Sequence, residues 1–148
     1  MPIVSRIVPE FDLLYVLVVG ESSMESLIEY RSTKMNIALL DHPNLSILVD
    51  FTKGDVEIGL PAIKALMKIN KQEYEAKGDL LKTVVVSNSS FSMIMAETIR
   101  LIGDGLPLKL EVYTTVPDAL KGLGLEDHLE RIITMREEML LGGDTTDL

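Results

Sequence analysis

Short apolar runs alternate along the chain with longer segments in which apolar residues recur every three or four positions. β-branched runs occur at Val16–Val19, Leu45–Asp50 and Thr83–Val86. The last two are apolar on successive residues, which is typical of strands buried on both faces. Leu106–Tyr113 alternates apolar with polar residues, which predicts a strand nearer the edge of the sheet.

The N-terminal segment predicts a hairpin. Ile3–Val8 is a weaker strand, and Pro9 separates it from the strand that contains Val16–Val19 and stops at Gly20. Because proline is confined to the edges and ends of strands, we expect the two segments to pair at the sheet edge.

The segments between and after these strands predict helices. Ser22 and Glu25 have the spacing of a capping box, and Pro43 ends the helix that they begin. Further helices are expected from near Pro61 to Gly78, over Phe91–Ile102, over Thr115–Gly122 and from about Glu126.

The resulting order is β-β-α-β-α-β-α-β-α-α, which predicts an α/β fold. We expect a single domain over residues 1–141, with a mostly parallel central sheet of about five strands and helices on both faces. The polar residues 142–148 are expected to form a flexible tail.

Composition narrows the classes of function. The chain has 148 residues, 47% of them hydrophobic, and no cysteine, which excludes disulfides and a thiol nucleophile. Its net charge of −9 disfavours binding to nucleic acid or to anionic membranes, because both require a positive surface. No segment is typical of a signal peptide or a transmembrane helix, so we expect a soluble, cytoplasmic protein.

Several stretches of sequence resemble one known family. They are Tyr15–Gly20 leading into Ser22–Glu25, Leu48–Phe51 closing the central strand, Leu81–Val86 before a helix, and Leu110–Leu120. Together they resemble the STAS family of anti-anti-sigma factors, and in particular its SpoIIAA-like (STAS/SEC14-type) branch. The resemblance spans roughly residues 11–133 and implies a regulatory or protein-interaction module.

The sequence departs from that family at the phosphorylation switch. In anti-anti-sigma factors a serine within Asp-Ser-Ser-Gly-Leu is phosphorylated at the start of a helix. The matching stretch here is Asp55-Val56-Glu57-Ile58-Gly59-Leu60, with Ile58 in place of the serine. We therefore expect the phosphoserine switch to be absent. The candidate residues of the switch loop are Thr52, Asp55, Glu57, Ile58 and Gly59.

Ligands of open parallel sheets bind beyond the carboxyl ends of the strands. Four segments are expected to be loops at that edge: 20–23, 50–55, 87–90 and 114–115. Within them, Ser87, Asn88, Ser89 and Ser90 either receive an anion at a helix N-terminus or only cap that helix. An apolar ligand or a partner would be met by Phe91, Met95 and Ile99 on the next helix.

Candidate chemistry is sparse. Asp50, Asp55 and Glu57 have the oxygen ligands that Mg²⁺ takes, but solvated loop charges are the favoured interpretation. Neither His42 nor His128 has a partner at metal-ligand spacing. A hydrolase would require one of these histidines within hydrogen-bond reach of Ser22, Ser87 or Ser89. We expect no catalytic residues, no metal and no cofactor.

The leading hypothesis is a non-catalytic regulatory or protein-interaction module, with an unknown protein partner. The alternative is a carrier of an apolar or lipid-like small molecule. On the last helix we expect Leu129, Ile132, Ile133 and Leu140 to face inward. Met135 and Met139 fall outside that row, which favours a homodimer formed through this helix.

Overall fold

The computed structural model describes residues 3–23, 26, 29–30, 33, 41–42, 44–57, 68, 82–88 and 110–142, and of 22–23, 55–57 and 110 it describes the backbone. The elements are β1 (Ile3–Val8), η1 (Pro9–Phe11), β2 (Leu13–Ser23), β3 (Ser46–Glu57), β4 (Thr83–Val86), β5 (Leu110–Tyr113), α5 (Val116–Gly122), η4 (Glu126–His128) and α6 (Leu129–Gly142).

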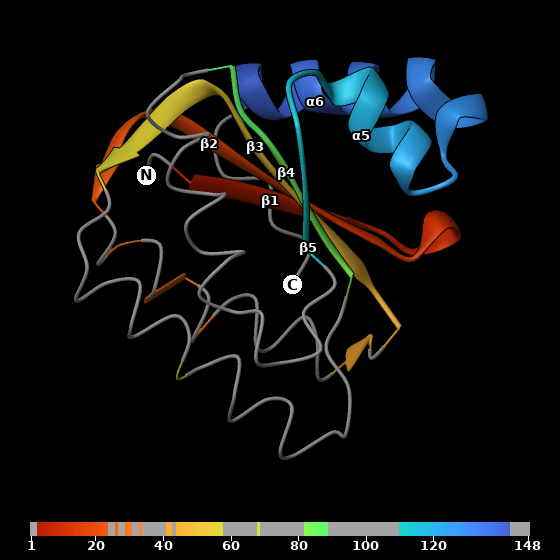
Figure 1. Ribbon diagram of the computed structural model, residues 1–148, viewed down its shortest axis with the longest axis horizontal. Helices are drawn as coiled ribbons and strands as arrows, with labels where there is room; N and C mark the ends of the chain where they lie inside the picture. The colour runs from red at the N-terminus through yellow and green to blue at the C-terminus, as the bar shows by residue number, and fades with distance from the viewer. Residues whose placement is uncertain are drawn as a thin grey trace.

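The strands form one mixed sheet in the order β1-β2-β3-β4-β5 (Figure 1). β1 pairs antiparallel with β2, which confirms the N-terminal edge hairpin. The pairs β2–β3, β3–β4 and β4–β5 are parallel. The fold is therefore α/β, as the sequence predicted.

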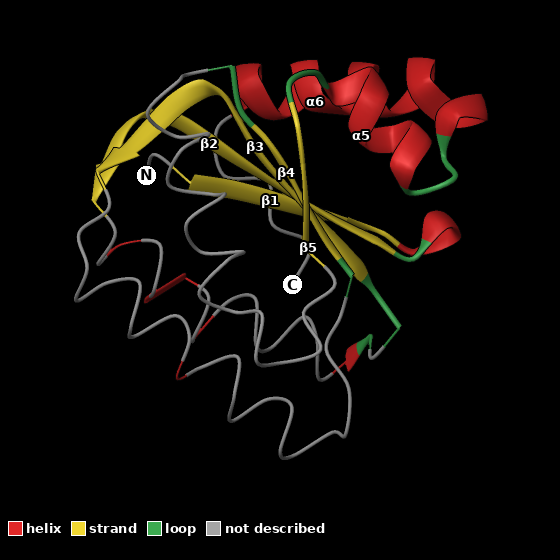
Figure 2. Cartoon of the chain, in the orientation of Figure 1, coloured by secondary structure: helices red, strands yellow, loops and turns green. Residues whose placement is uncertain are grey.

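The helices α5 and α6 lie on the same side of the sheet (Figure 2). The helices expected between β2 and β5 fall on residues outside those described, so helices on both faces stay a prediction. Both faces of the central strands are nevertheless buried, as the neighbours Val84 and Val85 on β4 and Ile47 and Leu48 on β3 show.

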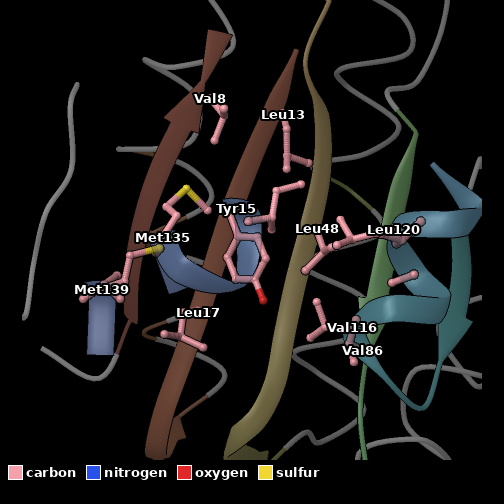
Figure 3. Close-up of a cluster of buried hydrophobic side chains, with 14 residues drawn as sticks. Val8, Leu13, Tyr15, Leu17, Leu48, Val86, Val116, Leu120, Met135 and Met139 are labelled. Carbon is pink, nitrogen blue, oxygen red and sulfur yellow. The ribbon is translucent and has the colours of Figure 1, made fainter. Parts of the chain in front are cut away.

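One cluster of the core lies between the sheet and the two helices α5 and α6. It is aliphatic, with methionine from α6 and one tyrosine from β2 (Figure 3). Tyr15 lies between Met135 on one side and Leu48 on the other (Figure 3). The buried cluster comprises Val4, Val8, Leu13, Tyr15, Leu17, Leu48, Val84, Val86, Val116, Ala119, Leu120, Ile132, Met135 and Met139.

The predicted start of α5 is confirmed. Thr115 is extended and accepts a hydrogen bond from the Asp118 N–H through Oγ1 at 3.3 Å. Pro117 lies in the first turn, where its missing N–H has no helical partner to lose. Capping and proline together fix where β5 ends and α5 begins.

The strands β2 and β3 are longer than the sequence predicted. Residues 20–23 and 52–55, expected as loops, pair in parallel, with Val19 opposite Lys53 and Gly20 opposite Gly54. The pairing shifts by one residue between Leu17 and Val19, where β3 carries the extra residue of a β-bulge.

Gly54 permits this continuation. A Cβ at Gly54 would lie 2.5 Å from the Val18 carbonyl oxygen, so the two backbones approach more closely than any other residue allows. Glycine usually interrupts strands, but here the absence of a side chain at Gly54 allows β2 and β3 to stay paired.

The inward face of α6 differs from the prediction. Ile132, Met135 and Met139 are buried, whereas Leu129, Ile133 and Leu140 pack partly buried at the margin of the core. Met135 and Met139 therefore belong to the core, and the reason for expecting a homodimer through them was wrong. α6 also continues through Gly142, the first residue of the expected tail.

Candidate functional site

A buried polar cluster lies where the central strand ends. Asp50 closes the part of β3 that pairs with β4, opposite Val86, and its side chain is 0% exposed. Tyr15, on the neighbouring strand β2, is also fully buried. Alternation along the strands places Tyr15 and Asp50 on the face that α6 covers.

Both carboxylate oxygens of Asp50 accept hydrogen bonds. Oδ1 accepts from the Thr52 N–H at 2.8 Å and from Thr52 Oγ1 at 2.6 Å. Oδ2 accepts from the Tyr15 hydroxyl at 2.5 Å. The bulge after Asp50 sets the backbone of Thr52 so that both of its donors reach the same oxygen.

Arg136 of α6 completes the cluster. Its Nε donates to Asp50 Oδ2 at 2.7 Å, and its Nη2 donates to Thr52 Oγ1 at 2.6 Å. The Arg136 side chain is 14% exposed. A buried carboxylate requires a paired charge and full hydrogen bonding, and Arg136 supplies the charge. We call Tyr15, Asp50, Thr52 and Arg136 the Asp50 cluster.

The cluster shifts the pKa of two of its members. Burial, together with the charge and hydrogen bond of Asp50, raises the pKa of the Tyr15 hydroxyl above its ordinary value. Burial acts to lower the pKa of Arg136, but the hydrogen bond and charge of Asp50 outweigh it, so that pKa is raised. Tyr15 therefore stays neutral and Arg136 stays charged at physiological pH.

Three members of this cluster, Tyr15, Asp50 and Arg136, were not identified as site residues from the sequence. Asp50 was expected to be a solvated loop charge, which is wrong because it is buried and ion-paired. Arg136 lies four residues after Ile132 and four before Leu140, within the inward row of α6. A charged residue in an apolar helical row signals a buried partner, and that signal was present in the sequence.

The other predicted switch-loop residues are described in part. Asp55 and Glu57 belong to β3, paired with Glu21 and Ser23, rather than to a loop. Ile58 and Gly59 lie outside the described residues.

The serine-rich segment after β4 is described only at its start. Ser87 is fully buried, and its N–H donates to the Tyr113 carbonyl oxygen at 3.0 Å, whereas Asn88 is exposed. Ser89, Ser90, Phe91, Met95 and Ile99 lie outside the described residues, so anion and apolar-ligand binding there stay predictions.

The two histidines lie at the opposite end of the strands from Ser87. His128 stacks on Phe11, with ring centroids 4.2 Å apart, just before β2 begins. His42 accepts through its carbonyl oxygen from the Leu45 N–H, just before β3 begins. Ser87 follows the carboxyl end of β4. Because β2, β3 and β4 are parallel, neither histidine can serve as a base for Ser87.

Two further properties concern the described residues as a whole. Within them, no group of three or more histidine, aspartate and glutamate side chains is placed to hold a metal ion. No helix of the described part of the chain has the length and apolar character needed to cross a membrane.

Comparison of the chain with protein-family models and with curated proteins found no match. Its function is therefore inferred from its own residues and geometry.

Proposed function

We propose that this chain is a non-catalytic regulatory or protein-interaction module of the STAS type, without the phosphoserine switch. The observation that supports this most directly is the state of Asp50. The carboxyl end of a central parallel strand is where α/β proteins present reactive groups. Here the acid at that position is buried, and four hydrogen bonds, one of them from Arg136, occupy its oxygens.

In this proposal the Asp50 cluster has a structural role rather than a catalytic one. Asp50, Thr52 and Tyr15 belong to the sheet and Arg136 to α6, so the ion pair holds the last helix in a fixed position on the sheet. A carboxylate that served as base or nucleophile would need an accessible lone pair.

The partner surface in this proposal is the β2–β3 ribbon, residues 19–23 paired with 53–57. The ribbon continues past Asp50, the last residue of β3 that pairs with β4. It exposes Val19, Glu21 and Lys53. Val19 is one of two large exposed hydrophobic residues in the described part of the chain. This arrangement follows the general plan of a contact between proteins, an apolar centre with a polar rim.

Photo-crosslinking in cells tests this function. A crosslinking residue at Val19 is expected to give one discrete adduct with a single protein. The matched control is a crosslinking residue at Glu137, which is exposed on α6. The control should not give that adduct. The adduct should also disappear when Lys53→Glu reverses the charge beside Val19.

Two results would contradict the proposal. One is the absence of any adduct specific to Val19. The other is enzymatic turnover that is lost in Thr52→Val, since that would make the Asp50 cluster catalytic. The alternative function, a carrier of an apolar ligand in the region of Phe91, Met95 and Ile99, would instead give a co-purified small molecule by native mass spectrometry.

A further inference from the structure

A groove of about 670 Å³ lies between the β1–η1 segment and α6. Val8, Ile132 and Met135 line its apolar part. Its charged lining residues are Arg6, Arg131, Glu10, Glu130 and Glu138. Its volume is within the range of small-molecule sites. Its lining is mixed, with apolar side chains beside charged ones.

Each arginine of the groove already holds a carboxylate of the chain. Arg6 Nη1 lies 3.0 Å from Glu138 Oε2. Arg131 binds the Glu10 carboxylate with both terminal nitrogens: Nη1 donates to Oε2, and Nη2 donates to Oε1 at 2.7 Å. The side chains of Glu138 and Glu10 are 60% and 54% exposed. Either carboxylate can therefore turn into water at little cost and leave its arginine to another acceptor.

Arg6 also has a donor that its own chain does not satisfy. Its Nε is buried, and among the buried side-chain nitrogen and oxygen atoms of the described residues it is the one without a hydrogen-bond partner. In a guanidinium group, Nε–H and one Nη2–H form a planar edge that matches the two oxygens of a carboxylate. Glu138 occupies Nη1.

We propose that the groove binds an organic carboxylate with an apolar body. The carboxylate lies on Arg6 and the apolar body lies along Val8, Ile132 and Met135. The unpaired Nε–H of Arg6 sets the occupant, since a cationic donor takes an anionic acceptor. Glu138 competes for the same guanidinium, so it weakens binding. The proposal uses none of the residues on which the proposed interaction function rests.

Isothermal titration with simple probes tests the ligand class. Octanoate is compared with octanol, octylammonium and acetate, which respectively lack the charge, reverse it and lack the apolar body. Octanoate is expected to bind about tenfold more tightly than octanol or octylammonium, the usual effect of one charge-assisted hydrogen bond. It is also expected to bind at least about tenfold more tightly than acetate, because acetate has no apolar body to bury. Methyl resonances of Ile132 and Met135 are expected to shift during the titration.

Three variants test the site. Arg6→Gln is expected to weaken octanoate binding about tenfold, and Glu138→Gln is expected to strengthen it about threefold by removing the competitor. Glu137→Gln, next to Glu138 but outside the groove lining, is the matched control and should leave binding unchanged. Since Glu138 is mostly exposed, its variant decides the proposal even if Arg6→Gln fails to fold.

Several outcomes would overturn the proposal. They are no octanoate binding in the millimolar range, equal binding of octanol or octylammonium, shifts confined to residues outside the groove, or unchanged or weaker binding in Glu138→Gln. Binding of an acidic peptide without binding of octanoate would also overturn it and would assign the groove to a protein partner.

Discussion

Arg136 and Asp50 are 86 positions apart in the chain, and Arg136 Nε lies 2.7 Å from Asp50 Oδ2. This contact joins the last described helix to the central strand of the sheet. Asp50 has no access to water, whereas the Arg136 side chain retains 14% of its exposure. Removal of Arg136 would therefore leave a fully buried carboxylate without a partner, whereas removal of Asp50 would leave a guanidinium that already reaches water.

Removal of Arg136 is expected to be strongly destabilising. Arg136→Met leaves a fully buried carboxylate without a counter-charge, and the free energy of unfolding should fall by about 3–5 kcal/mol. Asp50→Asn should cost less, because Arg136 can turn toward water. Urea denaturation of both variants measures the difference.

The control for that comparison is Arg131→Met on the same helix. The Arg131–Glu10 pair is exposed on both sides, so the urea midpoint should hardly change. An equal loss in Arg131→Met and Arg136→Met would contradict a special role for the buried pair.

Tyr15 predicts a loss of stability at alkaline pH. Its pKa is raised in the folded protein by burial and by Asp50, from an ordinary value of 10.0 in the unfolded chain. Above that pH the unfolded chain releases a proton that the folded chain keeps, so the free energy of unfolding falls by about 1.4 kcal/mol per pH unit. Below pH 10.0 the hydroxyl is protonated in both the folded and the unfolded chain, so its full contribution to the free energy of unfolding is present.

Urea denaturation of the parent and of Tyr15→Phe checks this prediction. It is measured from neutral pH to a pH above 10.0, the ordinary pKa of the hydroxyl. The variant lacks the ionisable hydroxyl, so its stability should decline less steeply. Parallel pH profiles for the two proteins would show that Tyr15 does not cause the alkaline loss.

The burial of Met139 predicts a contrast within one helix. Met139 is 1% exposed and Leu141 is 90% exposed. Met139→Ala should lower the free energy of unfolding by about 2–5 kcal/mol because it leaves a cavity, whereas Leu141→Ala should stay within about 0.5 kcal/mol of the parent. Equal effects in thermal unfolding would mean that α6 packs through a different face.

Gly54 predicts a backbone clash. In Gly54→Ala the new Cβ would lie 2.5 Å from the Val18 carbonyl oxygen, which a side chain cannot relieve by rotating. The expected cost is about 1–3 kcal/mol, and amide exchange should increase in residues 19–23 and 53–57. The exposed neighbour Lys53→Ala is the control and should change neither quantity.

Local signals in the sequence were sufficient for the existence of the described strands, the start of α5 and the α/β class of the fold. Successive apolar residues in Thr83–Val86 and at Ile47–Val49 identified buried strands, Pro9 marked the turn of the hairpin, and Thr115 with Pro117 marked the start of α5. These signals are local because they depend on backbone preferences and on the burial period of a single segment.

Contacts between distant segments decided the rest. In the sequence, each of Gly20 and Gly54 predicts the end of a strand. In the structure the two glycines lie opposite each other on β2 and β3 and belong to the sheet. The sequence contains Tyr15, Asp50, Thr52 and Arg136, but their spacing along the chain does not show that they meet. The rotation of α6 on the sheet determines which of its residues are buried, and it places Met135 and Met139 in the core and Arg136 on Asp50. That rotation depends on side-chain packing and on the pairing of a buried charge. Both are interactions between segments far apart in the chain, so the sequence of one segment does not reveal them.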